Sequence, residues 1–349
     1  MKINVDNLKK MIDEKYISVQ KHPDLDLFIY NYTQKAQFDR VWNNETLQCR
    51  GLILDGDFNV VARPFPKFFN LEEAIDKGEQ LPIEDFEVTE KEDGSLGILY
   101  YADDFYLATR GSFVSEQAIK GTEILMKKYG DIDWNPDFTY LFEIIFPSNR
   151  IVLDYKGMED LILLAVIDTK QGTEMPYNEL KKKFGGIIPL VKKLDGIKDF
   201  NKLKELQEDN REGFVIRFKS GKRYKVKFEE YVRLHRLITG VNARRIWDLL
   251  RNKQPLDELL ERVPDEFFDW VKSTKENLEA QYTGYEDSAR WTWNLVKELP
   301  TRKEQAQAIF KQNKDCSAIV FKILDGQPHE EIIWQMIKPK HETPFKIEI

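Results

Sequence analysis

Apolar and polar residues alternate in short segments between residues 25 and 230, which is typical of half-buried β-strands. Lys225 and Lys227, for example, fall together on one face of such a segment. Asp55-Gly56 lies between two apolar runs and predicts a hairpin turn. Strands are expected over residues 51–55, 59–64, 86–93, 95–103, 104–112, 139–146, 160–168, 213–218 and 224–228.

Helical periodicity is rarer in this stretch and dominates after residue 237. Gly130 is expected to end the first helix in a left-handed conformation. In the later part, Thr301 and Glu304 have the spacing of a capping box. Helices are expected over residues 116–129, 177–184 and 200–208, and repeatedly between residue 243 and the end of the chain.

The change of periodicity predicts two domains, a mixed α+β domain over residues 1–240 and an all-helical domain over residues 241–349. Aromatic residues of the helical part recur at i, i+3 and i+4, so we expect them in its core rather than stacked on bases. They are Trp247, Phe267, Trp270, Trp291, Trp293 and Trp334.

Composition narrows the class of protein. The 349 residues are 42% hydrophobic and 12% aromatic, enough for a sizeable core. No stretch approaches the roughly 18 apolar residues of a membrane span, and the first residues predict an amphipathic helix rather than a secretory signal. Two distant cysteines and four histidines do not form a disulfide framework or a structural zinc site. A reducing cytoplasm is therefore expected.

The net charge of −7 argues mildly against a protein that coats nucleic acid, although net charge says little about one groove. Between Phe214 and Arg245 there are ten Lys or Arg residues and two acidic ones. This run is either a solvated surface or a phosphate-binding one. The pattern of charge alone leaves both alternatives open.

The segment from Lys91 to Ser95, with the sequence KEDGS, is the candidate for chemistry. It joins two expected strands, so its lysine can project from a strand end into a cleft, and Gly94 permits a sharp turn. A K-x-D-G tetrad also arises by chance in chains of this length. Taken alone, the segment is a hairpin with an exposed lysine.

Other segments change that interpretation. KEDGS resembles motif I of the covalent nucleotidyltransferases, residues 212–216 (EGFVI) resemble motif IV, and residues 224–227 (YKVK) resemble motif V. Three further segments are similar to those of the phage RNA ligase 1 family, the tRNA-repair type: residues 49–55, 63–70 and 142–155. Six blocks in the family's order between about residues 30 and 235 make a specific signal.

The resemblance implies a nucleotidyltransferase (ATP-grasp-like ligase) domain of antiparallel sheets with helices. The all-helical tail also resembles that family, since DNA ligases and capping enzymes carry an OB barrel after motif V. The implied activity is ATP-dependent joining of RNA 5′-phosphate and 3′-hydroxyl ends, in RNA or tRNA repair, through an AMP bound to Lys91. Nearby cations and Mg²⁺ (or Mn²⁺) would favour the neutral, nucleophilic amine of Lys91.

The resemblance also implies roles for other residues. Arg50, Lys67 and Tyr32 would contact the β- and γ-phosphates, and Arg110 stands where the family usually has lysine. Glu143 and Glu212 would hold the ribose or a metal, directly or through water. Adenine would lie in an aliphatic sandwich or against Phe146. The remaining implied site residues are Asp93, Gly94, Gly213, Lys225, Lys227 and Tyr231.

Three hypotheses follow. The first is an RNA ligase acting as a monomer on single-stranded or broken RNA, with no membrane and no obligate protein partner, in the cytoplasm of a bacterium or a virus-infected cell. The second is a DNA ligase or a guanylyltransferase. The choice between ATP and GTP, and whether a nicked DNA duplex or single-stranded RNA is sealed, would distinguish these enzymes from an RNA ligase. The third is a non-catalytic RNA-binding module that binds ATP without reacting.

Overall fold

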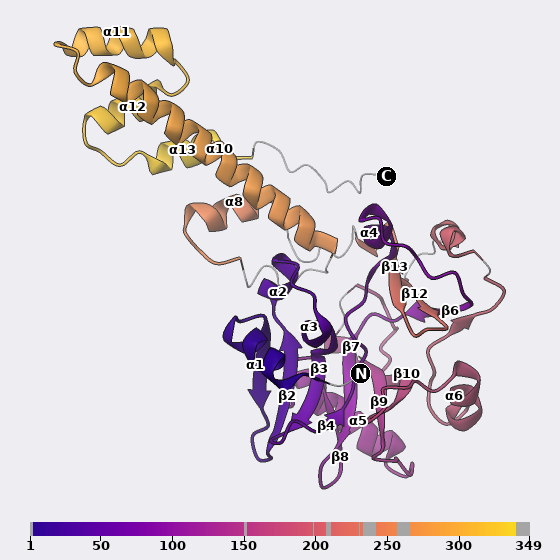
Figure 1. The fold of residues 1–349 in the computed structure, drawn as a ribbon. Helices are drawn as coiled ribbons and strands as arrows, with labels where there is room; N and C mark the ends of the chain where they lie inside the picture. The colour runs from indigo at the N-terminus through magenta and orange to yellow at the C-terminus, as the bar shows by residue number, and fades with distance from the viewer. Residues whose placement is uncertain are drawn as a thin grey trace. The chain divides into compact units, whose positions relative to one another are not determined.

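The computed structural model describes residues 3–149, 152–197, 199–206, 211–229, 231–232, 242–256 and 266–339. The chain divides into two compact units, residues 1–238 and residues 239–349 (Figure 1). The expected boundary at residue 240 lies outside the described residues and stays a prediction.

The described strands of the first unit form three sheets, antiparallel throughout except where β5 runs parallel to β13. Their orders are β1-β2-β3-β4, β10-β9-β7-β8 and β11-β6-β12-β13-β5. Every segment expected to be a strand contains one. The bounds are β1 Ile17–Lys21, β2 Leu27–Tyr32, β3 Arg50–Asp55, β4 Val60–Ala62, β5 Phe69–Asn70, β6 Phe86–Lys91, β7 Ser95–Tyr101, β8 Phe105–Ala108, β9 Phe138–Ile145, β10 Asp160–Asp168, β11 Lys193–Leu194, β12 Gly213–Phe218 and β13 Arg223–Lys227.

The first two sheets share one hydrophobic core, and strand alternation explains how each also packs against a helix. Ile53 of β3 lies in the shared core with Ile98 of β7. Leu52 and Leu54, on the other face of β3, pack against α1 (Val5–Asp13). In the same way, the outer face of the second sheet packs against α5 (Glu116–Tyr129). The expected α+β architecture of antiparallel sheets with helices is confirmed.

The third sheet is apolar on one face and charged on the other. Phe214, Ile216 and Phe218 of β12 are buried on its apolar face. The remaining short elements of this unit are α2 Gln34–Phe38, α3 Asn44–Gln48, α4 Leu71–Asp76, α6 Tyr177–Phe184 and the 3₁₀ turns Pro147–Asn149 and Phe200–Leu206. The described part of the helix expected over residues 200–208, Phe200–Leu206, is thus a 3₁₀ helix.

Gly130 does follow α5, but the prediction of a left-handed cap there is wrong. Its φ of −62° is right-handed. Glycine is needed at this position for another reason. A Cβ would come within 2.6 Å of the Met126 carbonyl oxygen. The close approach of the backbone, and not the sign of φ, accounts for the residue.

The described part of the second unit is helical. Its helices are α8 Ala243–Arg251, α10 Glu266–Val296, α11 Arg302–Gln312, α12 Ser317–Leu324 and α13 Glu330–Met336. The capping box of Thr301 and Glu304 is present at the start of α11. Ala289, Ile309 and Ile333 lie in the core that these helices share.

The aromatic residues of this unit only partly follow the expectation. Trp247 is buried, and its indole N–H donates to the Trp334 carbonyl at 2.7 Å. Trp291 is 57% exposed, so its placement in the core was wrong. Ala289, Thr292 and Val296 form the buried stripe of α10, and position 291 lies off that stripe. The side chain of Phe267 lies outside the described residues.

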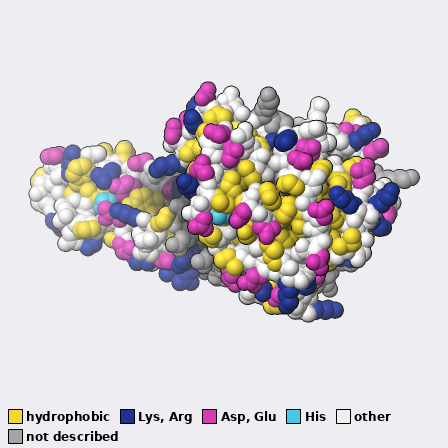
Figure 2. Space-filling model, turned by 90° about the horizontal axis from the view of Figure 1, so that it is seen from below, with side chains coloured by type: hydrophobic (Ala, Val, Ile, Leu, Met, Phe, Trp, Pro, Cys, Tyr) yellow, Lys and Arg dark blue, Asp and Glu magenta, His cyan; other side chains and the backbone are white. Residues whose placement is uncertain are grey.

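Within the described ranges, no helix combines the length and the apolar character needed to cross a bilayer. Figure 2 shows Lys and Arg side chains interspersed with Asp and Glu over the face that it presents. Cys49 and Cys316 are both buried and free, as expected for a chain without a disulfide framework.

Substitution of Gly213 tests the close approach of β12 and β13 in the third sheet. Its φ is +149°, and a Cβ would stand 1.9 Å from the Val226 carbonyl oxygen. Replacing Gly213 by alanine should therefore push β13 away from β12 and lower the free energy of unfolding by about 2–3 kcal/mol. Urea denaturation measures this change. Gly111→Ala is the control, since its nearest heavy atom would be Asn31 Nδ2 at 4.0 Å. Equal stability of the two variants would contradict the prediction.

Candidate active site

Lys91 is the last residue of β6, and the loop that follows it crosses from the third sheet to β7 of the second. Gly94 lies in this loop, where a Cβ would meet the Ile144 carbonyl oxygen at 2.6 Å. Its backbone N–H donates to Glu143 Oε1 at 2.9 Å. The need for glycine here is close packing against β9. The Glu143 carboxylate is thereby fixed beside the loop.

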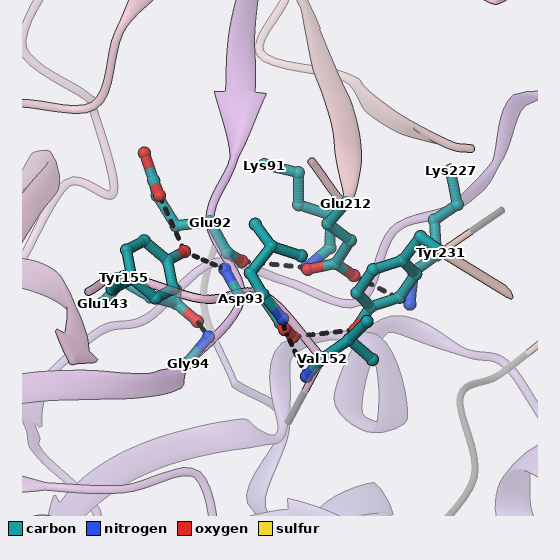
Figure 3. Close-up of polar contacts among 11 residues, drawn as sticks. Lys91, Glu92, Asp93, Gly94, Glu143, Val152, Tyr155, Glu212, Lys227 and Tyr231 are labelled. Atoms are coloured by element: carbon teal, nitrogen blue, oxygen red, sulfur yellow. Dashed lines mark hydrogen bonds and ion pairs between the residues drawn. The ribbon is translucent and has the colours of Figure 1, made fainter. Parts of the chain in front are cut away.

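Glu212 joins two lysines at the end of the third sheet. Its carboxylate lies 2.8 Å from Lys91 Nζ and 2.9 Å from Lys227 Nζ, and the side chain is 2% exposed (Figure 3). The strand register causes this arrangement, because Gly213 pairs with Lys91 on one side and with Lys227 on the other. Three of the expected site residues therefore form one buried ionic cluster.

Asp93 holds the same loop in place. Its Oδ2 accepts from the backbone N–H groups of Val152 and Leu153, both at 2.9 Å, and its Oδ1 accepts from the Tyr231 hydroxyl at 2.7 Å (Figure 3). Asp93 is 3% exposed. A buried carboxylate with three donors is well satisfied. Asp93 is thus a structural clamp on the Lys91 loop, and Tyr231 acts through it.

Tyr155 is a second clamp that the sequence did not single out. Its hydroxyl accepts from the Asp93 N–H at 2.8 Å and donates to Glu92 Oε2 at 2.9 Å. Burial raises the pKa of Glu92, an effect that the Tyr155 hydrogen bond opposes. The segment that resembles motif III contains Tyr155, but no spacing rule assigns the tyrosine to this loop.

Three carboxylates lie close enough around Lys91 to influence one another. Burial raises the pKa of Glu143 to about 8, Lys91 opposes the shift, and Glu212 and Glu92 add to it. No group of three or more His, Cys, Asp or Glu residues with the geometry of a metal site occurs among the residues that the structure describes. Any cation held by Glu143 and Glu212 would need further ligands from a substrate.

Lys91 borders a cavity of about 550 Å³ whose floor is the charged face of the third sheet. Cross-strand pairs on this face form three rows. The first row is Lys91, Gly213 and Lys227, the second Thr89, Val215 and Lys225, and the third Glu87, Arg217 and Arg223. Successive rows lie about 6–7 Å apart. Of the expected site residues, Arg50, Lys91, Gly94, Arg110 and Glu143 line this cavity.

The other expected cations gather around aromatic rings. Arg110 Nη1 lies 3.3 Å from the Tyr32 hydroxyl. Lys67 is buried, with its ammonium 5.3 Å from the ring centroids of Tyr32 and Phe69 and 5.5 Å from that of Trp42. Cation–π attraction stabilises such a charge. Phe69 lies among the aromatic residues that flank Lys67 in the segment 63–70. Nothing in the sequence pattern pointed to Trp42.

Lys225 is buried in the second row of the sheet face. Phe146, one of the two alternatives for contact with a base, is buried in the core against α5. Leu164 and Val215 line the cavity instead. Because Phe65, Phe68 and Tyr177 also line it, the cavity offers both aliphatic and aromatic walls.

A charged network at the far end of the cavity was not expected. Arg217 lies 3.4 Å from Glu87 and 3.3 Å from Glu174. Glu174 also pairs with Arg223, and Glu87 with Lys193 at 2.6 Å. These residues come from distant parts of the chain. Only the tertiary structure brings them together.

Comparisons with a family profile and with related proteins agree on one family. A family profile described as RNA ligase matches residues 48–232, more than half of the chain. An RNA ligase from Rhodothermus phage RM378 is 26% identical over 327 residues, covering 69% of this chain and 70% of the phage protein. A homologue from Thermovibrio ammonificans, also named as an RNA ligase, is 31% identical over 221 residues, covering 60% of this chain and 56% of that protein.

Among solved structures, an archaeal ATP-dependent RNA ligase has a TM-score of 0.48 and 14% identity, covering 93% of this chain and 96% of that chain. The present chain matches little more than half the length of the Thermovibrio relative.

The clamp on Asp93 can be tested by removing one hydroxyl. Tyr231→Phe leaves Asp93 Oδ1 buried without its donor, so the free energy of unfolding should fall by about 1.5–3 kcal/mol. Tyr101→Phe is the control, because this tyrosine is 44% exposed, and its loss of a hydroxyl should change stability by less than about 0.5 kcal/mol. Chemical denaturation compares them. An unchanged stability in Tyr231→Phe would show that the Asp93 clamp does not operate.

Proposed function

The chain belongs to the RNA ligase family, and on that premise we propose that it joins RNA 5′-phosphate and 3′-hydroxyl ends with ATP, through a lysyl-AMP on Lys91. One observation carries the proposal. Lys91 borders the cavity while its ammonium shares the buried Glu212 with Lys227. A nucleophile and a neighbouring cation are what transfer of a nucleotidyl group requires.

The first step forms a bond between Lys91 Nζ and the α-phosphorus of ATP. The bond from that phosphorus to the β-phosphate oxygen breaks, and pyrophosphate leaves. Glu212 Oε2, 2.8 Å away, can receive a proton that the amine gives up. AMP then passes to the RNA 5′-phosphate. Finally the RNA 3′-hydroxyl displaces AMP and closes the phosphodiester.

Arg50 and Arg110, which line the cavity, and other cations nearby would stabilise the charge of the triphosphate. Lys225 and Lys227 follow one another on the face of β13, where they would neutralise the α-phosphate. Arg50, Arg110, Tyr32 and Lys67 would bind the β- and γ-phosphates. The contact of Arg110 with Tyr32, which itself packs against Lys67, supports their acting as one group. An arginine in place of lysine keeps the charge and adds a planar fork of donors.

The aliphatic part of the cavity lining supports one of the two arrangements for adenine. Phe146 packs in the core and is not available for stacking, whereas Leu164 and Val215 border the cavity beyond Lys91. A purine would lie between these two side chains, with its ribose toward Glu143. Apolar contact on both faces of the ring suits a base.

Glu143 and Glu212 fit a divalent cation such as Mg²⁺ or Mn²⁺. Their carboxylates are hard oxygen ligands, and Mg²⁺ commonly binds through one or two carboxylates together with substrate phosphates. The mutual repulsion that helps raise the pKa of Glu143 is what a cation would relieve. When bound, the metal would neutralise charge on the phosphates.

The helical unit bears on the choice among ligases. In residues 242–256 and 266–339 the structure contains helices and no strand, whereas an OB barrel is built from strands. This supports an RNA ligase over a DNA ligase or a capping enzyme. We assign RNA recognition, of a broken tRNA or a similar strand, to this unit. The exposed Trp291 is suited to base stacking.

Covalent labelling tests the nucleophile. Protein incubated with Mg²⁺ and ATP labelled at the α-phosphate should carry the label, and Lys91→Ala should carry none, because the bond to phosphorus cannot form. Lys120→Ala on α5, outside the cavity, should label like the wild type. Gel autoradiography measures the result. Label that persists in Lys91→Ala would disprove this assignment, and ATP that binds without labelling would favour a non-catalytic module.

End joining tests the substrate. With ATP, we expect sealing of 5′-phosphorylated single-stranded RNA and of a tRNA broken in its anticodon loop, and no sealing of a nicked DNA duplex. Denaturing gels with end-labelled strands measure all three. Sealing of the DNA nick alone would identify a DNA ligase, and labelling by GTP in place of ATP a guanylyltransferase.

A further inference from the structure

Arg63 is a buried cation that the proposed reaction does not use. The residue is 9% exposed, and its Nε donates to the Thr169 carbonyl at 3.1 Å while its Nη1 donates to Gln48 Oε1 at 2.9 Å. Both acceptors are neutral. Burial lowers the pKa of Arg63, and the charge of Asp168 opposes that shift without cancelling it. Because arginine is rarely buried without a carboxylate partner, this side chain needs another explanation.

One nitrogen of Arg63 remains available. Nη2 forms no hydrogen bond within the described ranges, yet it is not one of the side-chain nitrogens that are both buried and without a partner there. It therefore keeps accessible surface. Arg63 lines a second cavity of about 440 Å³, bordered by residues 63–66, residues 171–174 and the β12–β13 turn at residues 219–221. Nη2 can thus donate to a ligand in the second cavity.

The protein holds this guanidinium in position before any ligand binds. The backbone N–H of Arg63 donates to Thr139 Oγ1 at 2.9 Å, and the hydroxyl oxygens of Thr139 and Thr169 lie 2.9 Å apart. Gly172, with a φ of +76°, packs against the arginine, since a Cβ there would lie 3.2 Å from Arg63 Cδ. A side chain that is already fixed loses little conformational entropy on binding.

The second cavity has an excess of positive charge. Among the described residues, its charged lining consists of four cations and one carboxylate, namely Arg63, Arg217, Lys219, Arg223 and Glu174. Glu174 already pairs with Arg217 and Arg223. Within the described part of the chain, neither Arg63 nor Lys219 forms an ion pair. Arginine and lysine together suit the oxygens of a phosphate group.

The rest of the lining is partly apolar and includes Pro64, Phe65 and Ile167. A cavity within the range of roughly 300–1,000 Å³, with a few placed polar groups, is typical of sites for small organic ligands. We propose that the second cavity binds a phosphate ester, with its phosphate at Arg63 and Lys219 and its carbon skeleton against the apolar lining. A free nucleotide and one phosphodiester of an RNA strand share this chemistry. Lys91 lines the first cavity and not the second, so the inference does not rest on the proposed function.

Titration with inorganic phosphate, followed by ³¹P NMR at constant ionic strength, tests the two cations. Arg63→Met should weaken phosphate binding about tenfold, and Lys219→Met about threefold, because an exposed charge contributes less than a buried one. Gln48→Glu should weaken binding about as much as Arg63→Met. Its new carboxylate would pair with the guanidinium and keep it in place, so the loss would report charge rather than a collapsed cavity.

Matched variants control for other sites and for folding. Lys222→Met, on the same hairpin but outside the second cavity and paired with Glu79, should keep the wild-type affinity. Arg110→Met changes the first cavity alone, so phosphate binding that falls in this variant and persists in Arg63→Met belongs to the first cavity. If circular dichroism shows that Arg63→Met does not fold, Lys219→Met and Gln48→Glu decide the question.

Competition against the phosphate bound at Arg63 identifies the source of the ester. Displacement by AMP and not by an RNA hexamer with hydroxyl groups at both ends indicates a free nucleotide, and displacement by the hexamer indicates an RNA strand. If neither displaces phosphate, the site takes an inorganic anion and the ester is wrong. Equal phosphate affinity in the wild type, Lys219→Met and Gln48→Glu overturns the proposal, as does an equal loss in Lys222→Met and Lys219→Met.

Discussion

Glu212 places a negative charge in a buried position, and the arrangement of the sheet face around Lys91 depends on how that charge is compensated. A buried carboxylate is unfavourable by several kcal/mol unless cations and hydrogen bonds satisfy it. Lys91 and Lys227 do so from opposite sides, at 2.8 and 2.9 Å. Each lysine therefore has a fixed position for its ammonium before any ligand arrives, which reduces the reorganisation that a reaction at Lys91 requires.

This compensation works only in one register of the third sheet. Lys91, Gly213 and Lys227 must lie side by side, since a shift by one residue would turn each lysine to the apolar face. Gly213 allows β12 and β13 to approach at this point. From the other direction, Asp93 ties the loop to residues 152–153 and to Tyr231. Backbone packing and a buried carboxylate together position Lys91, the proposed nucleophile.

The residues that sequence reasoning found are those whose role follows from local pattern. Lys91 ends a strand before a glycine loop, and Lys225 and Lys227 alternate with apolar neighbours, so their common face could be predicted. Nothing local connects Glu174 with Arg217, because strand pairing and a turn far along the chain bring them together. Whether Phe146 could contact a base was left open for the same reason. Phe146 looks available until its burial is known.

Errors arose where one pattern has two physical causes. A glycine after a helix signals a left-handed residue or a close backbone contact, and Gly130 is the second case. Gly94 likewise serves packing against Ile144 rather than a sharp turn alone. Helical spacing placed Trp291 in the core, but the buried stripe of α10 passes through Ala289 and Thr292.

The charge at Lys91 changes sign during the proposed reaction, so the site must compensate a different distribution of charge in the covalent intermediate than in the resting state. A positively charged ammonium becomes a phosphoramidate whose nitrogen is neutral and whose phosphoryl group is negative, beside the carboxylates of Glu92, Glu143 and Glu212, whose charges already affect one another. Lys227 then remains as the cation on Glu212. Lys225 lies on the same face of β13 and Arg110 lines the cavity, so their charges would oppose the added negative charge. These fixed cations are therefore suited to the covalent intermediate as well as to the empty site.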